Sequence, residues 1–378
     1  MDISIILGPF LPSLPGPAGA VEKIWQGIGE RLSLAGHKVT IIEKAGAVHH
    51  PDGGGLIYQQ VRGYDRPFGM FRTLLCDFIY SHRALAVVPN SDIIISNTFF
   101  LPTIFMLPQR IIKTGGLGLL IPSIARMPKG QLRLFRKVSA ITTVSNAAKQ
   151  AIISELRRSE VTNNVYVIPN PVDTSVFHSI GRASKPTRRI LFAGRIAPEK
   201  GVKQLVSAFV KLRKQGHMPN FELIVIGPHE VSRGGGGSGY FEACKAGTEG
   251  HPIQFLPTIH DPKLLAEEMR LADFFAYPSL AEKGETFGVS VLEAMACGAV
   301  AMVSDLACFQ DFVTDGSNGF VFDHRLNVEA TLEKTLLKIS KSDDISGMSR
   351  NAATTARMFS YEAITAQYEK LLFSLIKP

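Results

Sequence analysis

The chain has 378 residues, of which 45% are hydrophobic and 20% are charged, and its 34 glycines and 22 prolines are spread along the sequence. This composition excludes a disordered, collagen-like or coiled-coil protein, and the length predicts two or three domains. No apolar run reaches the roughly 20 residues of a membrane-spanning helix, the first residues lack the basic start of a secretory signal, and the four cysteines lack metal-ligand spacing. We therefore expect a cytoplasmic protein with reduced thiols and no metal.

Short β-branched segments alternate with amphipathic segments of helical length through most of the sequence. Several of the short segments are continuously apolar, which is typical of parallel strands covered on both faces. The alternation predicts βαβ repeats, and therefore an α/β fold with two doubly wound, Rossmann-like sheets. Strands are expected over residues 3–7, 39–43, 92–96, 110–113, 140–144, 165–168, 189–193, 221–226, 252–256, 273–277, 299–303 and 319–322. Helices are expected over residues 21–35, 147–158, 202–215, 264–271 and 359–375.

A linker divides the chain near its middle. Residues 168–173 (IPNPVD) contain two prolines, and residues 179–187 are polar with glycine, serine and proline. We therefore expect a first domain over residues 1–173 and a second over residues 174–359. A terminal helix within residues 360–378 is expected to pack back on the first domain.

A glycine-rich segment, residues 233–239 (RGGGGSG), interrupts the second half of the chain. The four consecutive glycines, Gly234 to Gly237, differ from the spaced glycines of a phosphate-binding loop. We interpret this segment as a flexible loop without a catalytic role, which is either a natural insertion or an engineered linker.

The first candidate binding motif follows the first expected strand. Residues 8–20 (GPFLPSLPGPAGA) end where a helix is expected to start, and Gly19 lies next to that start. Small residues there allow backbone N–H groups to approach an anion, which the helix dipole also favours. The spacing fits neither the dinucleotide fingerprint nor the Walker A loop, which disfavours a dinucleotide enzyme and a P-loop ATPase. The alternative is an ordinary surface loop.

The second motif, residues 194–201 (GRIAPEKG), follows the first strand of the second domain. Open α/β sheets bind ligands at the carboxyl ends of their strands. Arg195 would offer a fork of donors and Lys200 a point charge, and together they suit a diphosphate. A proline-containing turn of this kind is also common on protein surfaces.

The third motif, residues 278–298 (PSLAEKGETFGVSVLEAMACG), runs from a strand through a loop into a short helix. Glu285 lies in the loop, and Glu293 lies about two turns into a helix that is expected to start near Gly288. The helix is expected to stop at Gly298, because glycine favours helix C-termini. A diphosphate would meet the helix N-terminus, and the two carboxylates would reach sugar and ribose hydroxyls.

Together these segments resemble glycosyltransferase family 4. The resemblance lies in the spacing of Glu285 and Glu293, in the GRIAPEKG segment, in NPVD at residues 170–173 and in FSYE at residues 359–362, and it extends over nearly the whole chain. Members of this family are retaining, metal-independent enzymes of the GT-B fold, in which two Rossmann-like domains face a central cleft. They take a sugar from a nucleotide diphosphate, so the resemblance implies a hexosyltransferase-type enzyme without a cofactor.

The resemblance also implies roles for individual residues. Arg195 and Lys200 would bind the diphosphate, and together with Glu285 they would carry catalysis. Glu285 would bind hydroxyls of the transferred sugar, Glu293 the ribose, and Gly19 would lie at the phosphates. A UDP-sugar is favoured over a GDP-sugar as the donor. The donor site would comprise Gly19, Arg195, Lys200, Glu285, Thr286, Phe287, Gly288, Val289 and Glu293.

The first domain departs from the family in one respect. Family members often carry a histidine there, near the sugar, whereas residues 96–98 and 113–116 contain none. A retaining front-face mechanism needs no enzymatic nucleophile, because the departing diphosphate can deprotonate the acceptor, so activity is not excluded. Two alternatives stay open, namely a sugar-nucleotide 2-epimerase of similar architecture and a non-catalytic nucleotide-sugar-binding subunit.

Positive charge is concentrated in the first domain. Residues 1–173 hold 18 basic against 11 acidic residues, a net charge of +7, and residues 126–158 hold eight basic residues and one acid. Leu132, Leu134 and Phe135 lie between these charges, so this stretch is a candidate for contact with an anionic membrane at its inner face. We expect a lipid-linked or phosphorylated acceptor, as in cell-envelope polysaccharide or glycolipid assembly, and no nucleic acid, because no nucleic-acid motif accompanies the charge. A solvated basic face is the alternative.

Overall fold

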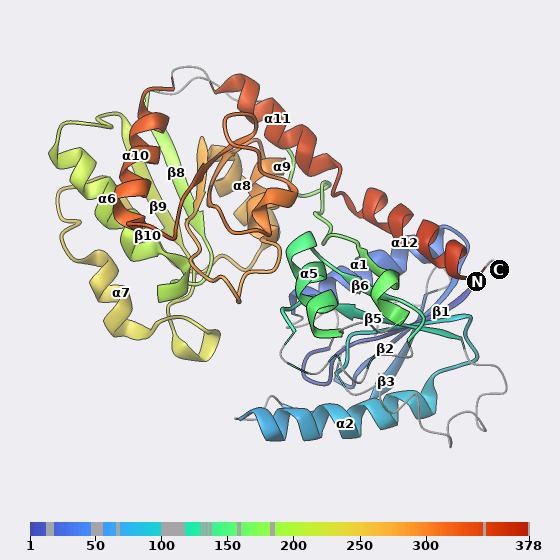
Figure 1. The fold of residues 1–378 in the computed structure, drawn as a ribbon. Helices are drawn as coiled ribbons and strands as arrows, with labels where there is room; N and C mark the ends of the chain where they lie inside the picture. The colour runs from blue at the N-terminus through green and yellow to red at the C-terminus, as the bar shows by residue number, and fades with distance from the viewer. Residues whose placement is uncertain are drawn as a thin grey trace. The chain divides into compact units, whose positions relative to one another are not determined.

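The chain divides into two compact units, each built on a parallel β-sheet flanked by helices (Figure 1). The first unit comprises Met1–Pro171 and Tyr361–Pro378, and the second comprises Val172–Ser360. The expected α/β fold with two Rossmann-like sheets is confirmed. The computed structural model describes residues 1–12, 19–46, 56–65, 69–99, 118–128, 130, 132, 135, 138–156, 160–181, 186–342 and 345–376.

Within its described residues, the sheet of the first unit has the strand order β3-β2-β1-β4-β5-β6-β7. Neighbouring strands are parallel, and the chain winds from the central β1 first to one edge and then to the other, which is the doubly wound arrangement. The strands are β1 (Asp2–Ile6), β2 (Lys38–Lys44), β3 (Leu56–Val61), β4 (Ile93–Ser96), β5 (Leu119–Ile124), β6 (Ile141–Thr143) and β7 (Val165–Val167). The helices are α1 (Ala20–Leu34), α2 (Met70–Val87), α5 (Asn146–Leu156), η2 (Glu160–Asn164) and α12 (Tyr361–Ile376).

The sequence pattern did not predict two strands of this sheet. β3 has the sequence LIYQQV and lies at the edge of the sheet. Its polar residues interrupt the apolar pattern by which other strands were predicted. β5 contains Pro122, and proline disfavours a strand interior, but this residue lies where the pairing of β5 passes from β4 to β6. The missing N–H group of proline therefore costs the ladder little. The strand expected over residues 110–113 lies outside the described residues.

The core of the first unit includes side chains that the sequence analysis placed on a membrane. Leu132 is fully buried and Phe135 is 4% exposed, and both belong to a core cluster with Ile141 and Ile152. For Leu132 and Phe135 the expected membrane contact is therefore wrong, because these side chains are buried in the core. Leu134 and most of the basic side chains of the stretch lie outside the described residues.

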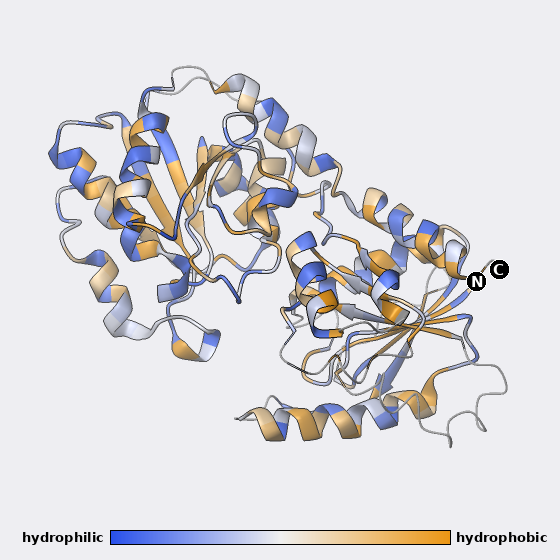
Figure 2. Cartoon of the chain, in the orientation of Figure 1, coloured by the Kyte–Doolittle hydropathy of each residue, from blue (hydrophilic) through white to orange (hydrophobic). Residues whose placement is uncertain are grey.

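Helix α2 is buried along only half of its length. Its second half packs into the core through Tyr80, Ala84 and Leu85, whereas its first two turns contain no buried side chain. Figure 2 shows apolar residues along this helix as well as on the strands of both sheets. In the part of the chain that the structure describes, no helix is long and apolar enough to cross a membrane.

Helix α12, at the end of the chain, packs on α1 in the first unit. Arg31 donates through Nε to Oε1 of Glu362 at 2.8 Å, and the rings of Trp25 and Tyr368 lie 5.1 Å apart. The chain therefore returns to the first unit after completing the second.

Within its described residues, the sheet of the second unit has the order β10-β9-β8-β11-β12-β13, with the same winding as the first and parallel pairs throughout. Two of its strands span the predicted residues without a shift, 221–226 and 319–322. The strands are β8 (Arg188–Ala193), β9 (Phe221–Ile226), β10 (Ile253–Leu256), β11 (Phe274–Tyr277), β12 (Val300–Ser304) and β13 (Gly319–Phe322). The helices are η3 (Pro198–Lys200), α6 (Val202–Lys214), η4 (Val231–Arg233), α7 (Gly237–Lys245), α8 (Pro262–Leu271), α9 (Val289–Ala296), η5 (Phe309–Asp311), α10 (Val328–Ser340) and α11 (Ser346–Arg357).

The winding of the second sheet reverses between β8 and β11. These strands lie side by side, although the chain leaves them toward opposite edges of the sheet. Ligands of doubly wound sheets bind outside the carboxyl ends of the strands at such a switch point. The loops that follow these two strands, residues 194–201 and 278–288, carry the second and third sequence motifs.

The two ends of the second unit lie next to each other. Val172 and Ser360 form an isolated parallel bridge, and the N–H of Val172 donates to the carbonyl of Phe359 at 2.8 Å. The second unit is therefore an insertion whose chain enters and leaves at one place.

Candidate functional site

Three polar side chains converge where the loops after β8 and β11 meet. The Nζ atom of Lys200 donates to Oε2 of Glu285 at 2.6 Å and to Oη of Tyr277 at 2.7 Å. The side chains of Lys200 and Glu285 are only 9% and 10% exposed. The structure thus brings together two of the three residues that the sequence indicated as catalytic.

Lys200 is charged in this setting. Burial disfavours the ammonium, but the Tyr277 hydroxyl and the Glu285 carboxylate outweigh that effect and raise the pKa of Lys200 above its ordinary value. Burial, followed by the charge of Glu285, raises the pKa of Tyr277 to about 12, so the phenol stays neutral. An ammonium has three N–H donors. Two of them serve Tyr277 and Glu285, and among the described residues no third acceptor contacts Nζ.

Arg195 lies on the exposed side of the same loop. Its Nη1 donates to the carbonyl of Gly234 at 2.5 Å, and its Nη2 lies 3.4 Å from Oε1 of Glu199. The Arg195 side chain is 45% exposed. A guanidinium that is anchored on one side and open on the other can receive a phosphate.

The glycine-rich segment that anchors Arg195 has a defined backbone structure, so its interpretation as a flexible loop is wrong. Its first residues end η4, and Gly237 begins α7. A Cβ atom on Gly235 would lie 2.3 Å from the carbonyl oxygen of His229. These glycines therefore serve close backbone packing, and the carbonyl of Gly234 belongs to the environment of Arg195.

The loops that carry Lys200 and Glu285 approach each other at Gly201. This residue has a left-handed φ of 69°, and a Cβ atom there would lie 2.1 Å from the carbonyl oxygen of Pro278. The N–H of Leu280 also donates to the carbonyl of Glu199 at 2.8 Å. Only glycine permits this approach, which places the cation beside the carboxylate.

The loop after β11 enters α9 through Gly288, as predicted. Gly288 is the N-cap with a φ of 93°, no side chain caps the helix, and Gly298 follows its end with a left-handed φ of 85°. The side chain of Phe287 is buried against Phe312 and Phe359, with ring centres 5.4 Å and 6.0 Å away. Phe287 can therefore face a ligand only with its backbone.

The remaining predicted residues of this motif are half-buried. Thr286 precedes Phe287 in the loop, Val289 is the first residue of α9, and Glu293 lies in the body of α9. They share one loop and helix with Glu285, whereas Lys200 comes from the neighbouring loop.

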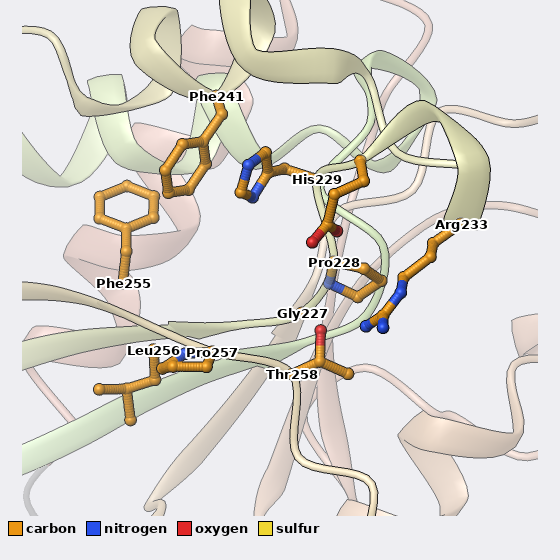
Figure 3. A pocket seen from close by; sticks show the side chains of 10 residues that line it. Gly227, Pro228, His229, Arg233, Phe241, Phe255, Leu256, Pro257 and Thr258 are labelled. Atoms are coloured by element: carbon orange, nitrogen blue, oxygen red, sulfur yellow. The ribbon is translucent and has the colours of Figure 1, made fainter.

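A cavity of about 370 Å³ opens at the carboxyl ends of β9 and β10 (Figure 3). The rings of His229 and Phe241 stack 4.2 Å apart, and Phe255 meets Phe241 edge-on at 5.5 Å. Arg233 and Thr258 lie on another side of the cavity. Flat rings combined with a few polar groups suit a planar heterocyclic ligand. The lining residues are Gly227, Pro228, His229, Glu230, Arg233, Phe241, Phe255, Leu256, Pro257 and Thr258.

The cavity adjoins the Arg195 loop. The N–H of Ile196 donates to the carbonyl of Pro228, a lining residue, at 2.9 Å. Along the carboxyl edge of the sheet, the strand order places the cavity at β10 and β9, the two cations after β8, and Glu285 after β11. These features form one continuous strip.

In the first unit, the N-terminus of α1 is occupied by a carboxylate of the protein itself. Gly19 is the N-cap, and Glu22 turns back so far that a Cβ atom on Gly19 would lie 2.4 Å from its Oε2. Glu22 is 8% exposed, and burial raises its pKa although hydrogen bonds from nearby backbone N–H groups act in the opposite direction. Glu22 thus supplies only the acidic half of a capping box, because the glycine N-cap has no side chain to complete it. Residues 13–18 of the first motif lie outside the described residues.

Tyr277 and the aromatic cavity were not predicted from the sequence. A tyrosine at the end of the apolar strand β11 is indistinguishable from a core residue by pattern alone. The available signal for the cavity was the abrupt change from apolar strands to Pro228-His229 after β9 and to Pro257-Thr258 after β10. Such changes mark the carboxyl ends of strands, where ligands bind.

Residues 175–356, which contain the strip, match the family model described as glycosyl transferases group 1. The chain is 32% identical over 156 residues to the phosphatidyl-myo-inositol mannosyltransferase of Mycobacterium tuberculosis. That alignment covers 40% of this chain and 38% of the mannosyltransferase. The second unit therefore carries the sequence pattern of group 1 glycosyl transferases.

Solved structures share the fold over almost the whole chain. Sucrose-phosphate synthase from Thermosynechococcus elongatus aligns with a TM-score of 0.74 and 17% identity, covering 99% of this chain and 98% of that one. HepE from Anabaena, solved in complex with UDP and glucose, aligns with a TM-score of 0.69 and 18% identity, covering 99% and 100% of the two chains. The two Rossmann-like units are thus those of the GT-B glycosyltransferase fold.

Proposed function

We propose that this protein is a retaining glycosyltransferase that moves a sugar from a nucleotide-diphosphate sugar to a lipid-linked or phosphorylated acceptor. The observation that carries the proposal is the strip in which an aromatic cavity, Arg195 with Lys200, and Glu285 follow one another in strand order. A nucleotide-diphosphate sugar presents a base, two phosphates and a sugar in the same order. The match to glycosyl transferases group 1 supports this proposal.

Arg195 and Lys200 would bind the diphosphate and stabilise the charge that develops on it as the bond to the sugar breaks. These two cations would supply the charge that a bound divalent ion could otherwise supply. We therefore propose that turnover needs neither a metal nor a cofactor. Activity should persist after dialysis against EDTA, and its loss with recovery on adding Mg²⁺ would contradict this part of the proposal.

The rest of the donor would contact the loop after β11 and α9. Glu285 would accept hydrogen bonds from hydroxyls of the transferred sugar, and Glu293 from the ribose. The backbone from Thr286 to Val289 would lie beside the donor. The proposed contact of Gly19 with the phosphates would require the Glu22 carboxylate to leave the N-terminus of α1.

In the proposed front-face reaction, the acceptor oxygen attacks the anomeric carbon from the side on which the diphosphate leaves. The new C–O bond forms as the bond to the diphosphate breaks, and the departing diphosphate oxygen takes the acceptor proton. The anomeric configuration is thereby retained. NMR of the first product formed tests this directly, because an inverted anomeric signal would exclude the mechanism.

A donor screen tests the proposed activity as a whole. UDP-, GDP- and ADP-sugars are each incubated with the protein, and release of the nucleoside diphosphate is measured. Lys211→Ala provides a matched control for Lys200→Ala, because Lys211 lies in the same unit on α6 and pairs with Glu333 at 2.8 Å. Turnover lost in Lys200→Ala and kept in Lys211→Ala supports a transferase. Conversion of the sugar without diphosphate release would indicate the epimerase, and binding without turnover the non-catalytic subunit.

The proposed acceptor implies a surface that can meet a lipid. A relative of this chain is named a phosphatidyl-myo-inositol mannosyltransferase, which supports a glycolipid acceptor. On α2, Phe71, Leu75 and Phe78 recur at helical spacing on one face and are exposed, and Phe71 is 80% exposed. An exposed apolar stripe of this kind suits the interface of a bilayer.

The charges on α2 favour an anionic bilayer. Its one acid, Asp77, is buried and accepts from the N–H of Phe99 at 2.9 Å, so it presents no negative charge at the surface. Arg72 is exposed. A cation beside an apolar face binds anionic lipid headgroups. We therefore propose that α2 rests on the inner, anionic face of the membrane.

Sedimentation with lipid vesicles tests this surface. Phe71→Ser with Leu75→Ser should reduce pelleting with anionic vesicles by about tenfold, because two apolar side chains no longer enter the bilayer. Leu326→Ser is the control, since Leu326 is 71% exposed in the second unit. Equal pelleting of both variants, or pelleting with neutral and anionic vesicles alike, would contradict the proposed surface.

A further inference from the structure

A second charged cluster lies at the carboxyl ends of β12 and β13, outside the strip. His324 follows β13, and its side chain is only 4% exposed. Its Nε2 lies 2.8 Å from Oε1 of Glu282, and its Nδ1 contacts Oδ1 of Asp305, which follows β12. Arg325 contacts the same two carboxylates, with Nε 3.3 Å from Oε1 of Glu282. One buried imidazole thus joins two carboxylates from different loops.

This arrangement determines the charge of the ring. A neutral imidazole donates from one nitrogen and presents a lone pair at the other. Both ring nitrogens of His324 face carboxylate oxygens, so only the doubly protonated ring satisfies both contacts. Although burial acts to raise the pKa of Asp305, hydrogen bonds from the backbone and ring of His324, together with Arg325, lower it. Asp305 is therefore held as a carboxylate beside the ring.

Glu282 belongs to the loop that carries Glu285. The two residues share a turn in which the N–H of Glu285 donates to the carbonyl of Ala281 at 2.9 Å. The start of the loop is held separately, because Oγ of Ser304 donates to the carbonyl of Ser279 at 2.6 Å. Glu282 therefore adds a further attachment of this loop to the body of the sheet, beside the N–H of Leu280 on the carbonyl of Glu199 and the contact between Lys200 and Glu285.

We propose that His324 is a positioning residue that fixes Glu285 for recognition of the transferred sugar, by holding Glu282 through Nε2 of its buried ring. This inference rests on the proposed function, because it assigns Glu285 to the sugar. Loss of the contact between His324 and Glu282 loosens the tip of the loop, and recognition of the sugar weakens.

Donor kinetics test the proposal. In His324→Gln and in Glu282→Ala, we expect the KM for the nucleotide sugar to rise about tenfold, and the double variant to be no worse than either single variant, because both remove one tie. The affinity for the corresponding nucleoside diphosphate, which lacks the sugar, should stay within about twofold. His217→Gln, at an exposed site after α6, is the control.

Equal losses for the nucleotide sugar and the nucleoside diphosphate would overturn the proposal. Hydrogen exchange of residues 279–286 provides a readout that is independent of turnover. Their amides should exchange faster in His324→Gln than in His217→Gln at the same pH, and equal exchange would show that no tie exists. If this difference in exchange is present but the native protein turns over no UDP-, GDP- or ADP-sugar, the proposed function fails. The contact by which His324 holds the loop through Glu282 would then still stand.

Discussion

The two sheets have the same winding, but the loops after their central strands present opposite charges. After β1, the N-terminus of α1 is capped at Gly19 and receives the carboxylate of Glu22. After β8, the corresponding loop presents Arg195 and the buried Lys200 before α6 begins. The first unit thus supplies its own anion where the second supplies cations.

This difference shows that the doubly wound fold provides the place for a ligand but not its kind. Both units have a glycine-containing connection from the central strand into a helix at the switch point. A few side chains decide whether that position is satisfied internally or open to an anion. We therefore expect substitutions at equivalent places in the two units to have unequal effects.

The largest difference is expected from the cations. Lys200→Ala should lower kcat/KM for the donor by two to three orders of magnitude, or about 3–4 kcal/mol, because a charge that stabilises the leaving group is lost. Lys211→Ala, on the same unit, should be close to the native protein. Steady-state kinetics with the donor identified in the screen measure kcat/KM for both variants. Similar values for the two variants would contradict the proposed role of Lys200 in binding the diphosphate.

The two buried carboxylates provide the next comparison. Glu285→Gln should lower kcat/KM by about 2 kcal/mol, since a charged acceptor for sugar hydroxyls and the partner of Lys200 are lost together. Glu22→Gln should leave donor kinetics within about twofold, because that side chain caps α1. A large kinetic effect of Glu22→Gln would instead place the first unit's carboxylate at the substrate.

The helix-cap glycines should differ in stability rather than in kinetics. At Gly288 the φ angle is 93°, and a Cβ atom would lie 2.6 Å from Cε1 of the buried Phe309. Gly288→Ala should therefore lower the free energy of unfolding by about 2 kcal/mol. At Gly19 the φ angle is −79° and the nearest atom is the end of the Glu22 side chain, so Gly19→Ala should cost less than about 1 kcal/mol. Urea denaturation followed by circular dichroism compares the two variants.

The smallest expected effect is the pH dependence of stability. The pKa of Lys200 is raised above its ordinary value of 10.5 in the folded protein. Its contribution to stability is therefore fully present below that value and is lost as the pH rises through the folded-state pKa. Thermal unfolding between about pH 10 and pH 12 should show a steeper loss of stability in the native protein than in Lys200→Met. If the melting temperatures of the two proteins fell in parallel as the pH rises, the described environment of Lys200 would be contradicted.

Much of the second unit could be predicted because its strands are continuously apolar and its motifs lie at their ends. Helix α9 lies between Gly288 and Gly298 as expected, since glycines at both ends define its limits. The contact between Lys200 and Glu285 could not be predicted, because 85 residues separate them and only the strand order brings them together. The same holds for His324 and Glu282, which are 42 residues apart.

The expectations that failed did so where tertiary packing decides. Consecutive glycines look flexible in the sequence, but the packing of Gly235 against His229 is visible only in the structure. Leu132 and Phe135 lie between basic residues in the sequence, yet both side chains are buried in the core of the first unit. The exposed stripe on α2 lies in a helix that the sequence analysis had not identified, because apolar residues occur on both of its faces.

The bridge between Val172 and Ser360 makes the second unit a module in the engineering sense. Because its two ends are adjacent, the segment 172–360 can be excised without leaving distant ends, or rejoined by a short connection into a circular permutant. The first unit could likewise be closed by a short peptide between Pro171 and Tyr361. Donor-recognising modules from related enzymes could then be exchanged at this junction, so that donor preference and acceptor preference would be recombined independently.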